Sequence, residues 1–226
     1  MPLIHENLAF VKSKVAEAAA RAGGRADDVE LIAVSKTFPA EAVMEAVEAG
    51  QVCFGENRVQ ELLTKRPLLP PEVRWHLIGH LQSNKIRKVL PCVVCIHSVD
   101  SVDLASSISR ISMELDLTMP VLLEVNVAGE ASKHGFTPEQ LEMDMEALLN
   151  LPGVEVQGLM CVPPIAGEPE ENRPHFVFLR ELRDGLERRA GRKLPALSMG
   201  MSGDYEVAVE EGATLVRVGS AIFGGR

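Results

Sequence analysis

Lys36 stands at the end of an apolar run that begins at Glu30, immediately before Thr37, Phe38 and Pro39. A run of this kind predicts a strand, so we expect the Lys36 amine at a strand mouth, where partial desolvation lowers its pKa and makes it nucleophilic. Such an amine forms a Schiff base with an aldehyde, and pyridoxal phosphate (PLP) is the commonest aldehyde cofactor of this type. The alternative is that Lys36 simply ends a strand and points to solvent.

Two segments rich in serine and glycine predict a phosphate site. Ser198, Gly200 and Ser202 lie where an apolar run passes into a helical pattern, and Gly219 and Ser220 follow the last apolar run. Backbone N–H groups and hydroxyls at the start of a helix attract anions, and a glycine lets an anion approach the backbone closely. Each segment alone is more often a turn, but the two together favour phosphate binding.

Arg217 lies within the last apolar run. The ordinary role of an inward arginine is to belong to a structural ion pair. Beside a Schiff-base lysine and a phosphate site it would instead face the pyridine nitrogen of the cofactor. Arginine donates hydrogen bonds and does not accept them, so it would keep this nitrogen unprotonated and the ring a poor electron sink.

These residues need a scaffold that brings the ends of several strands together. Short apolar runs alternate with helical patterns, which predicts βαβ units and a mostly parallel sheet of the α/β class. Eight strands favour a (β/α)8 TIM barrel over an open sheet, and a barrel places function at the C-terminal ends of its strands. The G-x-G-x-x-G fingerprint and the Walker phosphate loop are absent. We expect strands at 31–34, 52–54, 75–78, 93–96, 121–125, 154–159, 196–198 and 215–218, and helices at 41–49, 103–115, 138–149, 174–190 and 205–211.

The N-terminal region predicts one more helix, which we expect to pack on the barrel within residues 1–24. Gly50 and Gly212 each follow a helical pattern and are expected to end it in the left-handed conformation. A chain of 226 residues fits one domain, so we expect a single barrel domain over residues 1–226. The N-terminal prediction rests on apolar residues at helical spacing, namely Leu8, Val11, Val15, Ala18, Ala19 and Ala22.

The composition excludes several functional classes. Hydrophobic residues make up 46% and charged residues 24% of the chain, as in an ordinary globular protein. The net charge of −9 argues against a general nucleic-acid binder, which needs a basic surface. No apolar run approaches the roughly 18 residues of a membrane span, and charged residues interrupt the N-terminus where a signal would lie. We therefore expect a soluble, cytoplasmic protein.

The cysteines do not predict a metal site. Cys92 and Cys95 form a C-x-x-C pattern, but no second such pair or suitably spaced histidine pair completes a metal cage. We expect all four cysteines to be reduced, and buried cysteine to act as a small hydrophobic residue. The four are Cys53, Cys92, Cys95 and Cys161.

Several polar residues each allow two interpretations. His76 lies within a predicted strand and serves either packing or function, and His80 and Gln82 either line the mouth of the barrel or lie in solvent. The basic cluster Asn84–Lys88 on an acidic protein is by default a solvated helix face. Its alternative role is to dock an acidic partner or a donor enzyme.

A series of ordered blocks closely resembles the pyridoxal phosphate homeostasis protein family over nearly the whole chain. That family resembles the barrel half of the fold-type III enzymes alanine racemase and ornithine decarboxylase, and we expect no room here for their second β domain. The blocks are Ala33-Val-Ser-Lys36-Thr, Phe54-Gly-Glu-Asn57-Arg-Val-Gln-Glu61, His76-Leu-Ile-Gly79-His-Leu-Gln-Ser-Asn84-Lys85, His97-Ser-Val-Asp100, Val125-Asn126 with Lys133 and Gly135, Gly158-Leu-Met160, Ser198-Met-Gly-Met-Ser202 with Asp204, and Val216-Arg-Val-Gly-Ser-Ala-Ile-Phe-Gly224.

The resemblance implies a role for each candidate residue. Lys36 would hold PLP covalently as an internal aldimine, Asn57 would lie beside the cofactor, and Arg217 would face its pyridine nitrogen. The phosphate would be held by Ser198, Gly200, Ser202, Gly219 and Ser220.

Two functional classes follow, a PLP carrier and an enzyme. A carrier would buffer PLP or deliver it to apo-enzymes without robust turnover. A closed barrel needs no partner strand, so we expect a monomer. An amino-acid racemase of fold type III needs two bases on opposite faces of the cofactor, and the only tyrosine of the chain is Tyr205. The missing second base favours the carrier. A Schiff-base aldolase is a third and weaker interpretation, and it predicts a protein without a bound chromophore.

Overall fold

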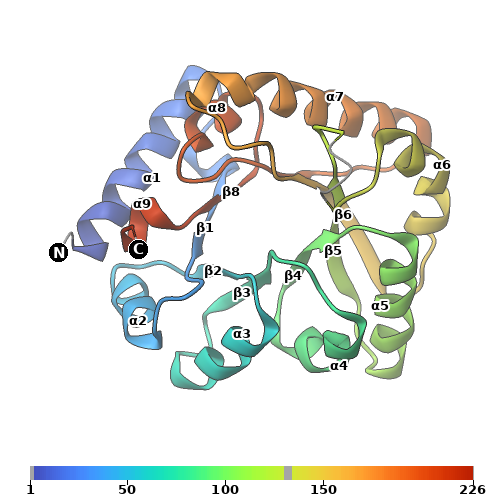
Figure 1. Cartoon of the computed structure of the whole chain (residues 1–226), viewed down its shortest axis with the longest axis horizontal. Coiled ribbons are helices and arrows are strands. Elements are labelled where there is room, and N and C mark those ends of the chain that lie inside the picture. Colours follow the sequence, from blue (N-terminus) through green and yellow to red (C-terminus); the bar gives the residue numbers. More distant parts are fainter. Residues whose placement is uncertain (1–2, 130–133, 226) are drawn as a thin grey trace.

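The computed structural model describes residues 3–129 and 134–225; Lys133, which contributes to the family resemblance, lies outside the described residues. Parallel strands pair in sequential order and close into a barrel (Figure 1). The predicted (β/α)8 barrel with an additional N-terminal helix is therefore confirmed. The strands are β1 (Glu30–Val34), β2 (Cys53–Glu56), β3 (Arg74–Leu77), β4 (Cys95–Val99), β5 (Met119–Val125), β6 (Val154–Cys161), β7 (Ala196–Ser198) and β8 (Leu215–Val218).

Helices surround this barrel on the outside (Figure 1). Those expected from the sequence are present with ends that differ by two residues at most, whereas α3 and α9 were not predicted, and α4 was expected only as the helix face of the basic cluster Asn84–Lys88. These three are four to seven residues long, too short for a hydrophobic period to show. The helices are α1 (Ile4–Arg21), α2 (Ala40–Glu48), α3 (Val59–Lys65), α4 (Ile86–Val89), α5 (Val102–Glu114), α6 (Pro138–Leu149), α7 (Arg173–Ala190), α8 (Tyr205–Glu210) and α9 (Ser220–Phe223).

Two strands begin later than their apolar runs predict and extend into polar residues. The run at 93–96 becomes β4, which continues through His97 and Ser98, and the run at 52–54 becomes β2, which includes Glu56. In a parallel barrel the ladder hydrogen bonds decide where a strand ends, whatever the side chain. The polar residues at these ends are therefore held as rigidly as the core.

The N-terminal helix α1 lies against the outer ring, beside α8, α9 and α2 (Figure 1). Its apolar face is buried, including Leu8 and Val11. The Asn7 side chain donates a hydrogen bond of 2.9 Å to the carbonyl of Ile222 in α9. Arg21, in the last turn of α1, forms ion pairs with two glutamates of α8, Glu206 and Glu210.

The expected glycine helix ends are confirmed, since Gly50 and Gly212 follow α2 and α8 with φ of +83° and +92°. All four cysteines are free thiols, and Cys53, Cys95 and Cys161 are buried. None of the helices within residues 3–129 and 134–225 combines the length and the apolar composition that crossing a bilayer requires.

Candidate functional site

Lys36 directly follows β1, and a buried ion pair fixes the residue before it. The Ser35 hydroxyl donates to Oε1 of Glu56 at 2.7 Å, and the Ser35 carbonyl accepts from Nζ of Lys65 at 2.8 Å. The same Lys65 ammonium lies 2.5 Å from Oε1 of Glu56. Burial raises the pKa of Glu56, and the hydrogen bond from Lys65 opposes this rise. The end of β1 is thus tied to β2 and α3 at the point where Lys36 leaves the barrel.

The residue after Lys36 has an unusual backbone conformation. Thr37 has φ of +69°, which is a genuine outlier for a β-branched residue and costs on the order of 1–3 kcal/mol. Its backbone N–H donates to Oε2 of Glu61 at 2.8 Å. The chain therefore turns sharply at Lys36, and Glu61 in α3 holds the turn.

Lys36 itself is exposed. The protein alone therefore does not supply the partial desolvation that its place at a strand end led us to expect. The strand ends at Val34, and the described residues leave the Lys36 side chain open to solvent.

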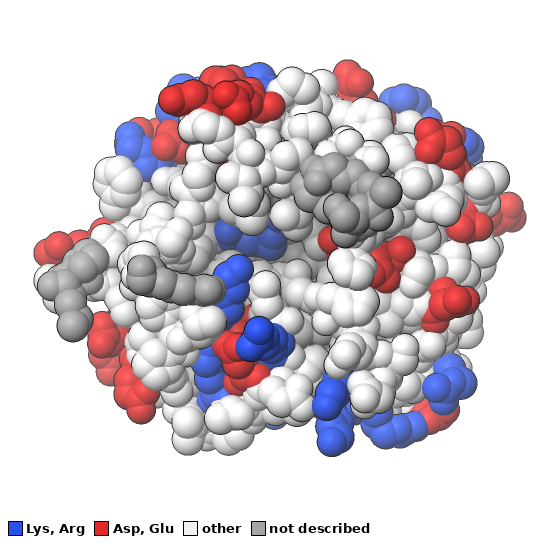
Figure 2. All heavy atoms as spheres, viewed as in Figure 1, with Lys and Arg blue, Asp and Glu red and all other residues white. Residues whose placement is uncertain are grey.

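Most of the predicted site residues line one cavity of about 390 Å³. The space-filling view is hollowed near its middle, with basic side chains at the edge of the hollow (Figure 2). The cavity brings together residues that follow β1, β2, β7 and β8, and its apolar lining includes Phe38, Ile78 and Val162. The predicted residues that line it are Lys36, Asn57, Ser202, Arg217, Gly219 and Ser220.

Ser202 offers a hydrogen-bond donor to this cavity. Its hydroxyl oxygen accepts the backbone N–H of Gly219 at 3.1 Å and that of Ala221 at 3.3 Å. A hydroxyl has two lone pairs and one proton, so with both lone pairs occupied its remaining capacity is to donate. A side chain at Gly219 would crowd the carbonyl of Val34, because a Cβ there would lie 3.2 Å from that oxygen. This part of the lining is suited to an anion.

Arg217 is a buried cation at the cavity wall, with 4% of its surface exposed. Its guanidinium donates to the Ser198 hydroxyl and to the carbonyl of Cys161. Among the residues that the structure describes, it forms no salt bridge with a carboxylate. Burial lowers the pKa of Arg217, but an arginine remains charged in proteins. A buried cation of this kind is stabilised by an acceptor that enters the cavity.

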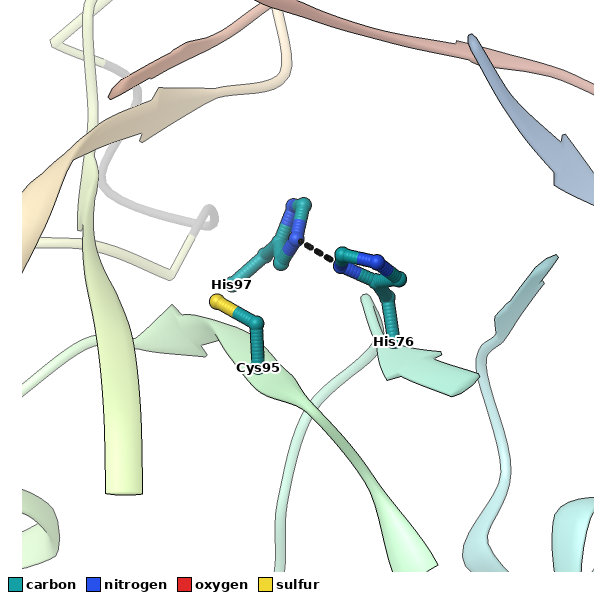
Figure 3. Close-up of side chains that lie close together, drawn as sticks. All are labelled: His76, Cys95 and His97. Carbon is teal, nitrogen blue, oxygen red and sulfur yellow. Dashed lines mark hydrogen bonds between the residues drawn. The ribbon is translucent and has the colours of Figure 1, made fainter. Parts of the chain in front are cut away.

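Ser198 is fully buried and lies between Arg217 and a pair of histidines. Its Oγ lies 2.9 Å from Nδ1 of His97, and Nε2 of His97 lies 3.0 Å from Nδ1 of His76. The two rings meet edge to face in the barrel interior (Figure 3). Burial lowers the pKa of His76 to about 4 and that of His97 well below its ordinary value. Both rings are therefore neutral at pH 7.

A row of hydrogen bonds runs from Arg217 through Ser198 and His97 to His76. Because the guanidinium can only donate, the Ser198 oxygen accepts from it. Among the described residues, Nδ1 of His97 is the partner of Ser198 that can accept the Ser198 proton, so we expect the hydroxyl to donate to it. The neutral His97 ring would then carry its proton on Nε2 and donate it to Nδ1 of His76. His76 would in turn carry its proton on Nε2, an atom without a hydrogen-bond partner among the described residues.

Two predicted residues do not line the cavity. Ser198 is committed to Arg217 and His97, so the geometry does not support its predicted contact with a phosphate. Gly200 lies beneath α8, where a Cβ would come within 2.6 Å of the Ala208 side chain and 2.9 Å of the Tyr205 backbone. The glycine, with φ of +91°, is thus required for packing against α8.

Comparisons with known proteins agree with this geometry. The family profile described as alanine racemase, N-terminal domain, matches residues 7–226. The pyridoxal phosphate homeostasis protein of Aquifex aeolicus is 46% identical over 222 residues, 98% of this chain and 97% of that protein. The protein of the same name from Pseudomonas aeruginosa is 45% identical, over 100% of this chain and 97% of its own length.

This chain belongs to the pyridoxal phosphate homeostasis protein family. The resemblance found in the sequence is therefore confirmed. Within the family's solved structures, PipY of Synechococcus elongatus PCC7942, described with PLP bound, is 39% identical with a TM-score of 0.87 over 98% of this chain and 100% of that one. Alanine racemase of Clostridium difficile shares the fold, with 17% identity and a TM-score of 0.78 over 100% of this chain and 57% of that one.

Sequence reasoning missed the roles of two residues that shape the site, Lys65 and His97. Lys65 was not considered, because nothing in a short helix marks one lysine as buried. His97 was noted as a polar residue at the end of the fourth apolar run and in a resemblance block, without a role. Its signal was its spacing of two residues from Cys95 in β4, which places both side chains on the same face of the strand.

Proposed function

We propose that this protein binds PLP in the cavity, covalently through Nζ of Lys36, and holds it for delivery to apo-enzymes without robust turnover of its own. Membership of the family supports this proposal, and so does the similarity to PipY described with PLP bound. The observation that carries it is the lining of one cavity by an exposed amine, a buried cation that forms no salt bridge with any described residue, and a hydroxyl that must donate. We also propose that the carrier acts as a monomer.

The lining fits the two polar ends of PLP. The Ser202 hydroxyl, the Ser220 hydroxyl and the glycine backbone at Gly219 suit a phosphate. Arg217 suits an uncharged heterocyclic nitrogen, to which a guanidinium can donate. When bound, PLP would supply an aldehyde that condenses reversibly with an amine and releases water. Lys36 would provide that amine, and Asn57 lines the same cavity.

The chain's own residues favour holding the cofactor over using it. A donor such as Arg217 leaves the pyridine nitrogen unprotonated, which weakens the ring as an electron sink. The only tyrosine, Tyr205, is buried in α8 with its pKa raised to about 12 by burial, and it does not line the cavity. The alternative function, a racemase-like enzyme of fold type III, needs a second base that the described residues of this cavity do not offer.

The first test is a Lys36→Ala variant, with Lys12→Ala on α1 as the control. We expect the purified protein to absorb in the visible, and borohydride to fix the mass of PLP on the peptide that contains Lys36. Lys36→Ala should lose both signals because no other described residue of the lining offers an amine, and Lys12→Ala should keep both. An unchanged spectrum in Lys36→Ala would contradict the covalent assignment, and a colourless parent protein would favour the aldolase interpretation.

A second arm separates carrier from enzyme. Loaded protein is mixed with an apo PLP-dependent enzyme, and separately with single L-amino acids. Recovery of the apo-enzyme's activity without formation of D-amino acids supports the carrier. Formation of D-amino acids at rates typical of enzymes, about 1–10³ s⁻¹, would refute it and favour the racemase.

A further inference from the structure

Three clusters of side chains in the described residues have the donor atoms of a metal site. In the first, His76, Cys95 and His97, the facing ring nitrogens already share a hydrogen bond, and burial raises the pKa of the Cys95 thiol to about 12 (Figure 3). A metal binds the thiolate, so this cluster is closed. In the second, Glu30, Cys53 and His76, the Cys53 thiol donates to Glu30 at 3.0 Å, and burial raises its pKa to about 12, which disfavours the thiolate that a metal binds.

The third cluster, His80, Asp100 and His134, lies outside the site described above. His80 follows β3, Asp100 follows β4, and His134 lies beyond β5. All three follow the C-terminal ends of parallel strands, so the cluster is on the same face of the barrel as Lys36. In the ring of strands, however, it sits across from β7, β8 and β1, whose ends surround the proposed PLP cavity.

The distances within this cluster suit coordination better than hydrogen bonding. Oδ2 of Asp100 lies 3.3 Å from Nδ1 of His80 and 3.5 Å from Nδ1 of His134. Both distances exceed the usual 2.7–3.2 Å of an N–H···O bond. They match the edge of a tetrahedron around zinc, which is about 3.3–3.4 Å for ligands about 2.0–2.1 Å from the metal. All three donor atoms lie within 4.8 Å of one another.

The surroundings orient the carboxylate and favour added positive charge. The Ser101 hydroxyl donates to Oδ1 of Asp100 at 3.2 Å, which leaves Oδ2 to face the two rings. Such outer contacts fix the direction of metal ligands. The half-buried carboxyl of Glu124 is close enough for the charge of Asp100 to raise its pKa further, beyond the rise that burial causes. A cation between the histidines would reduce this repulsion.

Solvent and ions can reach the third cluster, in contrast to the two clusters inside the barrel. The side chains of His80 and His134 are 50% and 64% exposed, and their rings stack with centroids 4.7 Å apart. A hydrated ion can therefore reach the site, and small rotations of exposed rings can complete the coordination. We propose that His80, Asp100 and His134 bind a divalent transition-metal ion of the Zn²⁺ type, with the remaining coordination position open to water or to an anionic ligand.

The test is a calorimetric titration of the untagged protein with ZnCl₂ after dialysis against a chelator. We expect one site that His80→Ala and His134→Ala each weaken by about 100-fold or more, since loss of an outer partner alone costs roughly 10–100-fold. Asp100→Asn, which keeps the shape and removes the charge, should weaken it as well. His5→Ala, at an exposed histidine of α1, is the matched control and should bind as the parent protein does.

Cobalt identifies the ligands independently. Co²⁺ in the same site should give the visible bands of nitrogen and oxygen coordination without thiolate-to-cobalt charge transfer. The proposal is overturned if the parent protein binds no Zn²⁺, if His80→Ala and His134→Ala bind it as tightly as the parent, or if a thiolate band appears. Equal weakening in His5→Ala would also overturn it.

Discussion

At the scale of the residue, Arg217 acts on groups that it does not touch. It can only donate, so Ser198 accepts from it, and we expect the Ser198 hydroxyl to donate to His97 and His97 to donate to His76. This row of hydrogen bonds holds the guanidinium from behind while leaving its other N–H groups for the cavity. We regard Ser198 and His97 as positioning residues for Arg217.

This direction can be measured without any cofactor. In protein labelled with ¹⁵N-histidine, we expect His76 and His97 at pH 7 to be neutral, with a protonated Nε2 and an unprotonated Nδ1. Ser198→Ala removes the donor to Nδ1 of His97 and should weaken or reverse this preference at His97. The exposed His5 serves as the reference ring.

A proton on Nδ1 of His97 in the parent protein would contradict the assignment. Retention of the same tautomer in Ser198→Ala would show that Arg217 does not set the direction through Ser198.

At the scale of the element, α3 holds the ends of β1 and β2 together beneath Lys36. Lys65 reaches from α3 to Glu56 on β2 and to the carbonyl of Ser35. Glu61, one turn earlier, accepts the N–H of Thr37. Both residues that flank Lys36 are thereby fixed by a helix that does not line the cavity itself.

Breaking the ion pair between Lys65 and Glu56 should lower the stability of the fold. Lys65→Met leaves the Glu56 carboxylate buried without its cation, and we expect a loss of about 3–5 kcal/mol in the free energy of unfolding. Glu56→Gln in the same background removes the uncompensated charge and should recover part of the loss. Urea unfolding at pH 7 measures both.

The control is Lys14→Met, which breaks the exposed ion pair with Glu17 on α1. It should move the urea midpoint far less, because an exposed pair is screened by water. A Lys65→Met protein as stable as the Lys14→Met protein would contradict the role assigned to the buried pair.

At the scale of the whole molecule, the two histidines cross the interior of the barrel, from β3 and β4 to β7 and β8. Their folded-state pKa values lie below the ordinary 6.5, at about 4 for His76 and well below 6.5 for His97. Below pH 6.5 the unfolded chain therefore binds more protons than the folded one. Their contribution to stability is complete above pH 6.5 and is lost progressively as the pH falls towards 4.

The parent protein is compared with a double variant, His76→Phe and His97→Phe. The free energy of unfolding of both proteins is measured with urea between pH 7 and 5. Over this range the parent should lose stability relative to the variant at up to roughly 1.4 kcal/mol per pH unit for each ring. The variant is needed because burial raises the pKa of Glu56 and Glu124, and these carboxyls act in the opposite direction. Parallel pH curves for parent and variant would contradict the prediction.

The sequence by itself determined the barrel, because the alternation of apolar runs and helical patterns is a local property that each segment carries in its own residues. It also determined the chemistry at the strand ends, where Lys36, Asn57, Ser202, Arg217, Gly219 and Ser220 were predicted and line one cavity. The exact ends of the strands were not predicted, because pairing with neighbouring strands, and not side-chain polarity, decides where a strand ends.

Only the tertiary structure decided which polar groups meet inside the barrel. Ser198 and His97 are 101 positions apart, on strands that are not neighbours, and no local pattern records a contact across the interior. The same holds for Gly200, which packing against α8 requires, and for Lys65, whose burial depends on β1 and β2. Contacts between distant segments are set by closure of the barrel, and closure is a property of all eight strands together.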